Sequence, residues 1–227
     1  ALWTLVEAAG AFASGEVSSR ELTQSCLARI EVWQPVINAF IHLEADLALQ
    51  MADAADAARA RGDALGPLAG VPMAHKDMFY RAGQLATCGS KIRRNFRPDY
   101  TGTVMQRLDA AGAVYLGGLN MSEFALGPTG HNVHWGACRN PWNPAHITGG
   151  SSSGSGAATA ARLTFGAMGS DTGGSVRLPA GANGVVGIKP TYGRVSRYGA
   201  MGLSFTHDGL GPLTRTVRDN ARIYGVI

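Results

Sequence analysis

Helix-type and strand-type patterns alternate along this 227-residue chain, and this alternation restricts the fold more than any other feature. Residues 18–21 have the Ser-x-x-Glu spacing of a helix capping box. The helix predicted after them has one apolar face, formed by Leu22, Cys26, Leu27, Ile30 and Trp33. A short extended segment is predicted at 38–43, and an Ala-rich helix follows at 44–61, ending before Gly62.

Several short apolar runs further along the chain predict buried strands. Residues 70–77 (GVPMAHKD) predict a strand that carries Lys76 near its C-terminal end. Further helices are predicted at 101–111, 155–163 and 220–227, and further strands at 113–116, 164–168 and 185–189. Helices that alternate with short buried strands indicate an α/β fold, in which a mixed β-sheet core is covered by helices on both faces.

Composition narrows the class of protein. Hydrophobic residues make up 45% of the chain and charged residues 16%, which disfavours disorder and favours a single domain over residues 1–227. The basic stretch Lys91, Arg93, Arg94 and Arg97 fits a solvated face better than a nucleic-acid site. Three scattered cysteines without a CxxC pair argue against a disulfide framework or a zinc site. The same cysteines suit a reducing cytosol, and no apolar run reaches the ~20 residues needed to span a bilayer. With the solvated basic stretch, these features lead us to expect a cytoplasmic protein that binds neither membrane nor nucleic acid.

Two Gly/Ser-rich segments need a separate explanation: residues 149–158 (GGSSSGSGAA) and 169–181 (GSDTGGSVRLPAG). A flexible linker is unsuitable, because the first segment leads directly into an Ala-rich helix and a buried strand. A phosphate-binding loop would end in Gly-Lys-Ser/Thr, which is absent, and a dinucleotide fingerprint would need glycine where Thr159 stands. A catalytic role remains. Successive backbone N–H groups of Thr172, Gly173 and Gly174 could stabilise an oxyanion during amide hydrolysis.

Both segments resemble the signature of the amidase signature family. The matching elements are Lys76 after its strand, the Gly-Gly-Ser-Ser motif at 149–152 and the Asp-x-Gly-Gly-Ser motif at 171–175. Ser151 and Ser175 are separated by the family's characteristic 24 positions. Further matches are found at 120–124, 184–199 and 211–216, so the resemblance covers nearly the whole chain.

The resemblance implies a Ser-Ser-Lys catalytic triad and an acyl-enzyme. Ser175 would be the nucleophile, and Ser151, preceded by a cis peptide bond, would connect it to the base Lys76. An exposed lysine has a pKa near ~10.4, so Lys76 must be buried to act as a base at neutral pH. Asp171 and Arg177 would hold the Gly-rich turn by hydrogen bonds, while Ser152 would satisfy backbone groups.

The same resemblance implies a small-molecule amide substrate, with no cofactor and no metal. Residues expected at the substrate pocket are Met121, Phe124, His131, His134 and Trp142. Family members are considerably longer, so the chain corresponds to the N-terminal part of the family fold plus the signature core, without the C-terminal portion. A homodimer is left open.

Three functional alternatives follow from the resemblance. A stand-alone amidase is favoured over the A subunit of glutamyl-tRNA amidotransferase, because residues 151–156 read SSSGSG where that subunit tends to have SSGGS. The sequence of the loop 127–134 also differs from the usual sequence of that subunit. The third alternative is a binding protein that keeps the fold without turnover.

Overall fold

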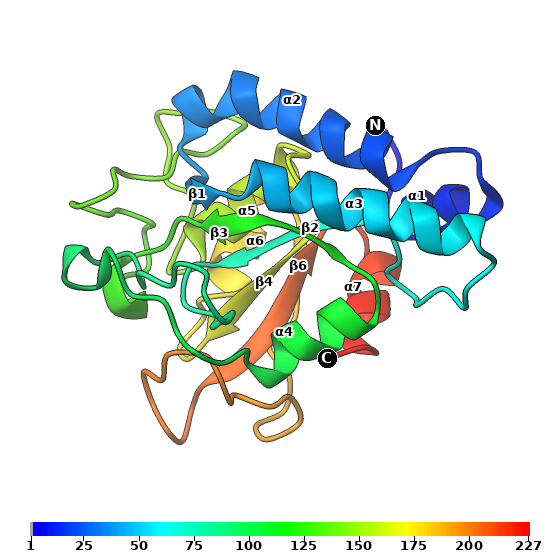
Figure 1. Ribbon diagram of the computed structural model, residues 1–227. Helices are drawn as coiled ribbons and strands as arrows, with labels where there is room; N and C mark the ends of the chain where they lie inside the picture. Colours follow the sequence, from blue (N-terminus) through cyan, green and yellow to red (C-terminus); the bar gives the residue numbers. More distant parts are fainter. Residues whose placement is uncertain (1) are drawn as a thin grey trace.

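A six-stranded mixed sheet forms the centre of the computed structural model, which describes residues 2–227 (Figure 1). The strand order is β1-β3-β2-β4-β6-β5. Strand β2 runs parallel to its neighbours β3 and β4, while β1, β6 and β5 pair antiparallel. The strands are β1 (Phe40–Leu43), β2 (Pro72–Lys76), β3 (Val114–Leu119), β4 (Gly166–Asp171), β5 (Val186–Gly187) and β6 (Gly209–Thr214). The predicted mixed sheet is therefore confirmed.

Helices pack against this sheet in an α/β arrangement. They are α1 (Leu5–Ser14), α2 (Ser19–Ile37), α3 (Ala45–Ala60), α4 (Thr103–Ala110), α5 (Ser153–Ala160), α6 (Arg177–Asn183) and α7 (Val217–Tyr224), with short 3-10 helices at Lys91–Arg93 and Glu123–Ala125. The crossovers β2–α4–β3 and β3–α5–β4 move in opposite directions along the sheet. Because such crossovers are right-handed, α4 and α5 lie on opposite faces (Figure 1). Within residues 2–227, no helix has the length and apolar character needed to cross a membrane.

The sequence predictions located most of these elements. The Ser18 capping box begins α2, with the Ser18 side chain bonded to the Glu21 N–H. Two elements were not predicted. Helix α1 begins at a second capping box, made by Thr4 and Glu7. Strand β6 has no strand-like sequence, because glycines and Pro212 interrupt its apolar residues, yet it pairs with β4 along its whole length. The strand predicted at 185–189 is only two residues long.

Small residues allow α5 to lie directly on the sheet. Residues 153–159 are all buried, and α5 contacts β2, β3, β4 and β6. A Cβ at Gly154 would lie 2.5 Å from the Asn120 nitrogen, and one at Gly156 would lie 2.9 Å from the Pro179 carbonyl oxygen. This close packing brings the N-terminal end of α5 next to the C-terminal ends of β2 and β4, where parallel strands end at one edge of the sheet.

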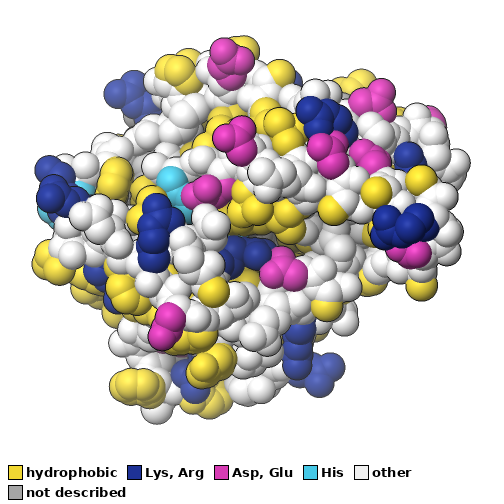
Figure 2. Space-filling model, in the orientation of Figure 1, with side chains coloured by type: hydrophobic (Ala, Val, Ile, Leu, Met, Phe, Trp, Pro, Cys, Tyr) yellow, Lys and Arg dark blue, Asp and Glu magenta, His cyan; other side chains and the backbone are white. Residues whose placement is uncertain are grey.

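Charged side chains of both signs are interspersed on the molecular face drawn in Figure 2. The net charge of +4 therefore does not collect into one dominant basic surface on this face. The predicted solvated character of the segment 91–97 agrees with its mainly exposed residues.

Candidate active site

Lys76 is the last residue of β2, the strand flanked by β3 and β4, and its side chain is completely buried. Its Nζ donates hydrogen bonds to Ser151 Oγ at 2.6 Å and to Ser170 Oγ at 2.8 Å. Burial lowers the pKa of Lys76 to about 7, although the nearby acidic groups of Cys88, Asp171 and Asp208 act in the opposite direction. An amine with such a pKa is partly neutral at physiological pH, as a general base requires.

Ser151 lies two residues before α5 and is also fully buried. The peptide bond between Gly150 and Ser151 is cis, as the family resemblance implies. A Cβ at Gly150 would lie 2.6 Å from the Gly127 carbonyl oxygen and 2.8 Å from the Gly130 nitrogen. Only glycine fits at position 150, because the loop 127–130 packs directly against it.

Ser175 lies in the turn between β4 and α6, and it is half-buried. Its carbonyl oxygen accepts a hydrogen bond from the Ser152 N–H at 3.3 Å, so the turn lies beside the chain that carries Ser151. Within the described residues, the Ser175 hydroxyl has no hydrogen-bond partner. It is therefore not already engaged by another protein group.

Asp171 holds this turn together. Its buried carboxylate accepts hydrogen bonds from the N–H groups of Gly174 at 2.7 Å, Val176 at 3.1 Å and Arg177 at 3.3 Å. The Arg177 guanidinium adds two more at 3.0 Å each. Burial raises the pKa of Asp171, but the hydrogen bonds from Arg177 and the backbone outweigh it and leave that pKa lowered. These are the contacts expected of Asp171 and Arg177 from the sequence.

The three expected oxyanion donors are not equivalent. The Gly174 N–H already donates to Asp171, so the expectation of a free donor at Gly174 does not agree with the structure. Gly173 is exposed, and a Cβ built there would meet no atom within 4 Å. Thr172 is fixed by other bonds, since its carbonyl accepts from Lys189 Nζ at 2.7 Å and its hydroxyl donates to Asp208 at 2.5 Å.

Ser170 is a site residue that the sequence analysis missed. It accepts a hydrogen bond from Lys76, and its backbone N–H and carbonyl each bond the Ser152 hydroxyl at 3.3 Å. Ser152 therefore satisfies backbone groups, as expected. The alternation of side chains along a strand could have indicated Ser170. Because Ser170 and Asp171 are neighbours in β4, their side chains point to opposite faces of the sheet, and Ser170 is on the face away from the Asp171 side chain.

A cavity of about 250 Å³ adjoins the same part of β4. Ser170 connects it to Lys76, and most of its lining is apolar. The lining residues are Met78, Ser170, Thr172, Arg197, Ala200, Met201, Gly202, Leu203, Phe205, Asp208 and Leu210.

None of the five residues expected at the pocket lines this cavity. Met121 is completely buried, and Phe124 is partly buried against the hydrophobic core. His134 lies 2.9 Å from the Glu123 carboxylate, and His131 lines a separate cavity. Trp142 is 73% exposed, and its indole N–H donates to the Asn183 carbonyl. These residues were expected from the family resemblance. In the structure, Met121 and Phe124 pack in or against the hydrophobic core, and the other three lie nearer the surface.

A family model described as Amidase matches residues 21–227. The chain belongs to the amidase signature family. Among similar proteins, the glutamyl-tRNA(Gln) amidotransferase A subunit of Halorhodospira halophila is 50% identical over 98% of this chain and 46% of its own length. The structure of peptide amidase from Stenotrophomonas maltophilia superposes with a TM-score of 0.96 at 39% identity, covering 100% of this chain and 48% of that one. A vestigial protein complex related to an s-triazine catabolic enzyme contains a chain with a TM-score of 0.94 and 47% identity, over 98% and 49% of the two chains.

This amidase signature chain thus spans about half the length of the relatives that it matches. Relatives of both kinds, a peptide amidase and an amidotransferase A subunit, are therefore similar to this chain. Identity is 50% to the amidotransferase relative and 39% to the peptide amidase.

Proposed function

We propose that this protein hydrolyses a carboxylic amide through an acyl-enzyme on Ser175, with Ser151 and Lys76 as the proton relay. The observation that carries the proposal is the 2.6 Å hydrogen bond from the buried Lys76 amine to Ser151 Oγ. Among the described residues, Lys76 forms no ion pair, and burial lowers its pKa by more than the nearby acidic groups raise it. A lysine in such a place is suited to exchanging protons.

The proposed reaction has two halves. Ser175 Oγ attacks the amide carbon while its proton passes to Ser151 Oγ, whose own proton passes to neutral Lys76. The negative charge that develops on the carbonyl oxygen is stabilised by the N–H groups of Thr172 and Gly173. The Lys76 ammonium then returns a proton through Ser151 to the leaving nitrogen, and the C–N bond breaks. Water attacks the acyl-enzyme in the second half, using the same relay.

A fluorophosphonate reagent tests the proposal directly. Attack by Ser175 would form a P–O bond and expel fluoride, which adds a mass detectable on the tryptic peptide containing residue 175. We expect labelling of the wild-type protein and of S14A, which removes an exposed serine at the end of α1. We expect no labelling of S175A and a large loss for K76A. A wild-type protein that gains no mass would support a binding homologue without turnover and refute the proposal.

A second candidate is the glutaminase component of a tRNA-dependent amidotransferase. The 50% identity to the glutamyl-tRNA(Gln) amidotransferase A subunit of Halorhodospira halophila favours it. Both candidates use the same acyl-enzyme and differ in substrate and partner. Ammonia release should be compared for glutamine and for short aliphatic and aromatic amides, with the protein alone and with amidotransferase partner proteins. Hydrolysis of simple amides by the protein alone supports an amidase, whereas glutamine hydrolysis that needs the partners supports the amidotransferase component.

A further inference from the structure

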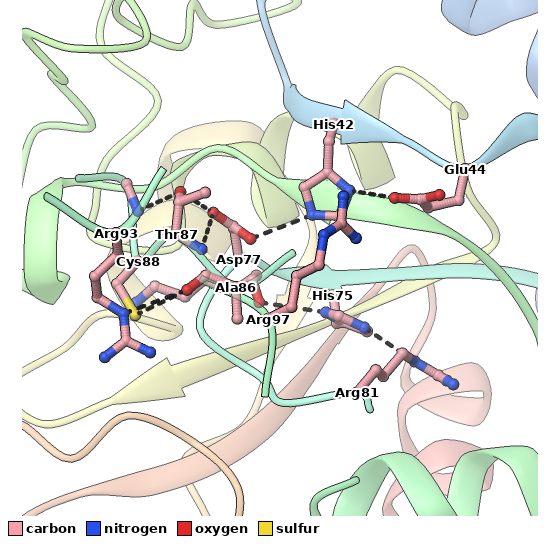
Figure 3. A network of polar contacts seen from close by, with 12 residues as sticks. His42, Glu44, His75, Asp77, Arg81, Ala86, Thr87, Cys88, Arg93 and Arg97 are labelled. Atoms are coloured by element: carbon pink, nitrogen blue, oxygen red, sulfur yellow. Dashed lines mark hydrogen bonds and ion pairs between the residues drawn. The ribbon is translucent and has the colours of Figure 1, made fainter. Parts of the chain in front are cut away.

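A partly buried histidine, His42, connects the edge strand β1 to the residue that follows Lys76. His42 Nδ1 lies 3.0 Å from Glu44 Oε1, and His42 Nε2 lies 3.3 Å from Asp77 Oδ1 (Figure 3). The Asp77 side chain is completely buried. Because carboxylates only accept hydrogen bonds, the histidine can donate to both partners only as an imidazolium with a proton on each nitrogen.

Asp77 is held from several directions, and this fixes the backbone directly after Lys76. The Asp77 N–H donates to the Leu119 carbonyl at 3.0 Å, and the Asp77 carbonyl accepts from the Cys88 N–H at 2.7 Å. Oδ2 of Asp77 accepts from the Thr87 N–H at 3.0 Å and from the Thr87 hydroxyl. Oδ1 is left for His42. The histidine therefore completes the set of contacts that anchors the end of β2.

Gly118 makes this contact possible. Strand β3 lies between β1 and β2, so the His42 ring must pass over β3 to reach Asp77. A Cβ at Gly118 would overlap His42 Nε2 and would lie 3.0 Å from Asp77 Oδ1. The backbone of Gly118 does not have a positive φ, so the space for the ring is what requires glycine here.

The surrounding charges favour the protonated ring. Burial lowers the pKa of His42, but the hydrogen bond and charge of Asp77, together with Glu44, outweigh burial and raise that pKa. The neighbouring His75 behaves oppositely, because burial, followed by the charge of Arg81, lowers its pKa well below the ordinary value. Burial also raises the pKa of Tyr115 well above its ordinary value, so this phenol stays neutral. Glu44 and Asp77 are thus the anionic groups that His42 bridges.

We propose that the Glu44–His42–Asp77 bridge positions Lys76 for proton exchange with Ser151, which makes His42 a positioning residue outside the catalytic triad. This inference rests on the proposed function. The bridge anchors the peptide beside Lys76 without touching the cavity next to Ser170. Its loss should therefore slow the chemical step and leave reagent affinity unchanged.

The bridge also gives a specific pH signature. Rate increases as Lys76 loses its proton, with a midpoint at about pH 7. Asp77 and Glu44 raise the pKa of His42 above its ordinary value, and once the ring loses its proton one of its two hydrogen bonds is lost. The fluorophosphonate labelling rate of the wild-type protein should accordingly rise and then fall. A purely structural clamp would not produce the falling limb.

The test measures the maximal labelling rate and the half-saturating reagent concentration from pH 5.5 to 9.5, for wild type, H42Q, G118A and the exposed-histidine control H146Q. H42Q and G118A should each lower the maximal rate by between about 10-fold and 100-fold, the range expected for a misplaced catalytic group. Both should lose the falling limb, with half-saturation unchanged. The double variant should lose little more than either single one, and H146Q should match wild type.

The outcomes separate the two proposals. A wild-type protein that is not labelled overturns the proposed function and, with it, the role of His42. A labelled wild type with H42Q equal to it, or with H42Q slower but retaining the falling limb, overturns the bridge alone. Should H42Q fail to fold, G118A decides, because its Cβ would overlap His42 Nε2: a maximal labelling rate equal to that of wild type overturns the proposal.

Discussion

Replacing Lys76 with methionine should change how stability depends on pH, and the structure gives the size of the effect. The pKa of Lys76 falls from its ordinary value of 10.5 to about 7 in the folded protein. The unfolded chain therefore binds more protons than the folded one between these two values. Stability of the wild type must rise with pH across this window, by about 5 kcal/mol in total at about 1.4 kcal/mol per pH unit.

At low pH, folding of the wild type requires Lys76 to lose its proton or to be buried with its charge, and this free-energy cost is absent in K76M. The substitution also removes two hydrogen bonds, those to Ser151 and Ser170. Their loss costs about 2 kcal/mol at about 1 kcal/mol each. Below pH 7, K76M should be more stable than wild type by about 3 kcal/mol, because the avoided penalty exceeds the lost bonds. Above pH 10, K76M should be less stable by about 2 kcal/mol. The difference between the two proteins should change sign near roughly pH 9.

Urea unfolding at pH 6, 7, 8, 9 and 10 measures these free energies, and K91M serves as the control because Lys91 is exposed. The pH of the sign change depends on the cost of the two hydrogen bonds, whereas the slope depends only on Lys76. Parallel stability curves for K76M and wild type would refute the reasoning. Such a result would mean that the Lys76 amine keeps its charge in the folded protein.

Two further predictions concern the turn and the loop around the site. D171A leaves buried backbone N–H groups and Arg177 without their acceptor, so urea unfolding should show a loss of about 3 kcal/mol. R177A should cost at most about 1 kcal/mol, because the arginine side chain is 54% exposed, and equal losses would contradict this account. G150A should lower the free energy of unfolding by about 1–3 kcal/mol, since its Cβ would meet backbone atoms of the 127–130 loop. In G181A, the added Cβ would meet nothing within 4 Å, so the free energy of unfolding should stay unchanged or rise slightly. A decrease in the free energy of unfolding as large as that of G150A would contradict the steric argument.

The sequence was most informative where local chemistry determines structure. The Ser18 capping box and the apolar periodicity after it are local signals, and they predicted α2 correctly. Strand β6 could not be predicted in this way. Its glycines and Pro212 have low strand propensity, and the strand exists because β4 supplies a partner along its length. Pairing between strands that lie far apart in the chain leaves no local pattern in the sequence.

The residues of the candidate site show the same contrast between what the sequence indicates and what only the folded structure shows. Lys76 and Ser151 were identified from the family resemblance, and the structure places their side chains 2.6 Å apart. The expected pocket residues came from the family resemblance, which does not show how deeply each side chain is buried in this chain. In the structure, Met121 lies in the core and Trp142 lies at the surface. The role of Gly174 was also hidden, because sequence alone does not show that Asp171 takes up its N–H.

The close fit of α5 against the sheet restricts how this protein can diversify. Every side chain between residues 153 and 160 is threonine-sized or smaller, and each neighbouring surface is already in contact. Added volume there would push on the segment that bears Ser151, since densely packed interiors transmit displacement instead of absorbing it. New substrate preferences are therefore expected to arise from changes in the surrounding loops, with this helix kept nearly invariant among functional descendants.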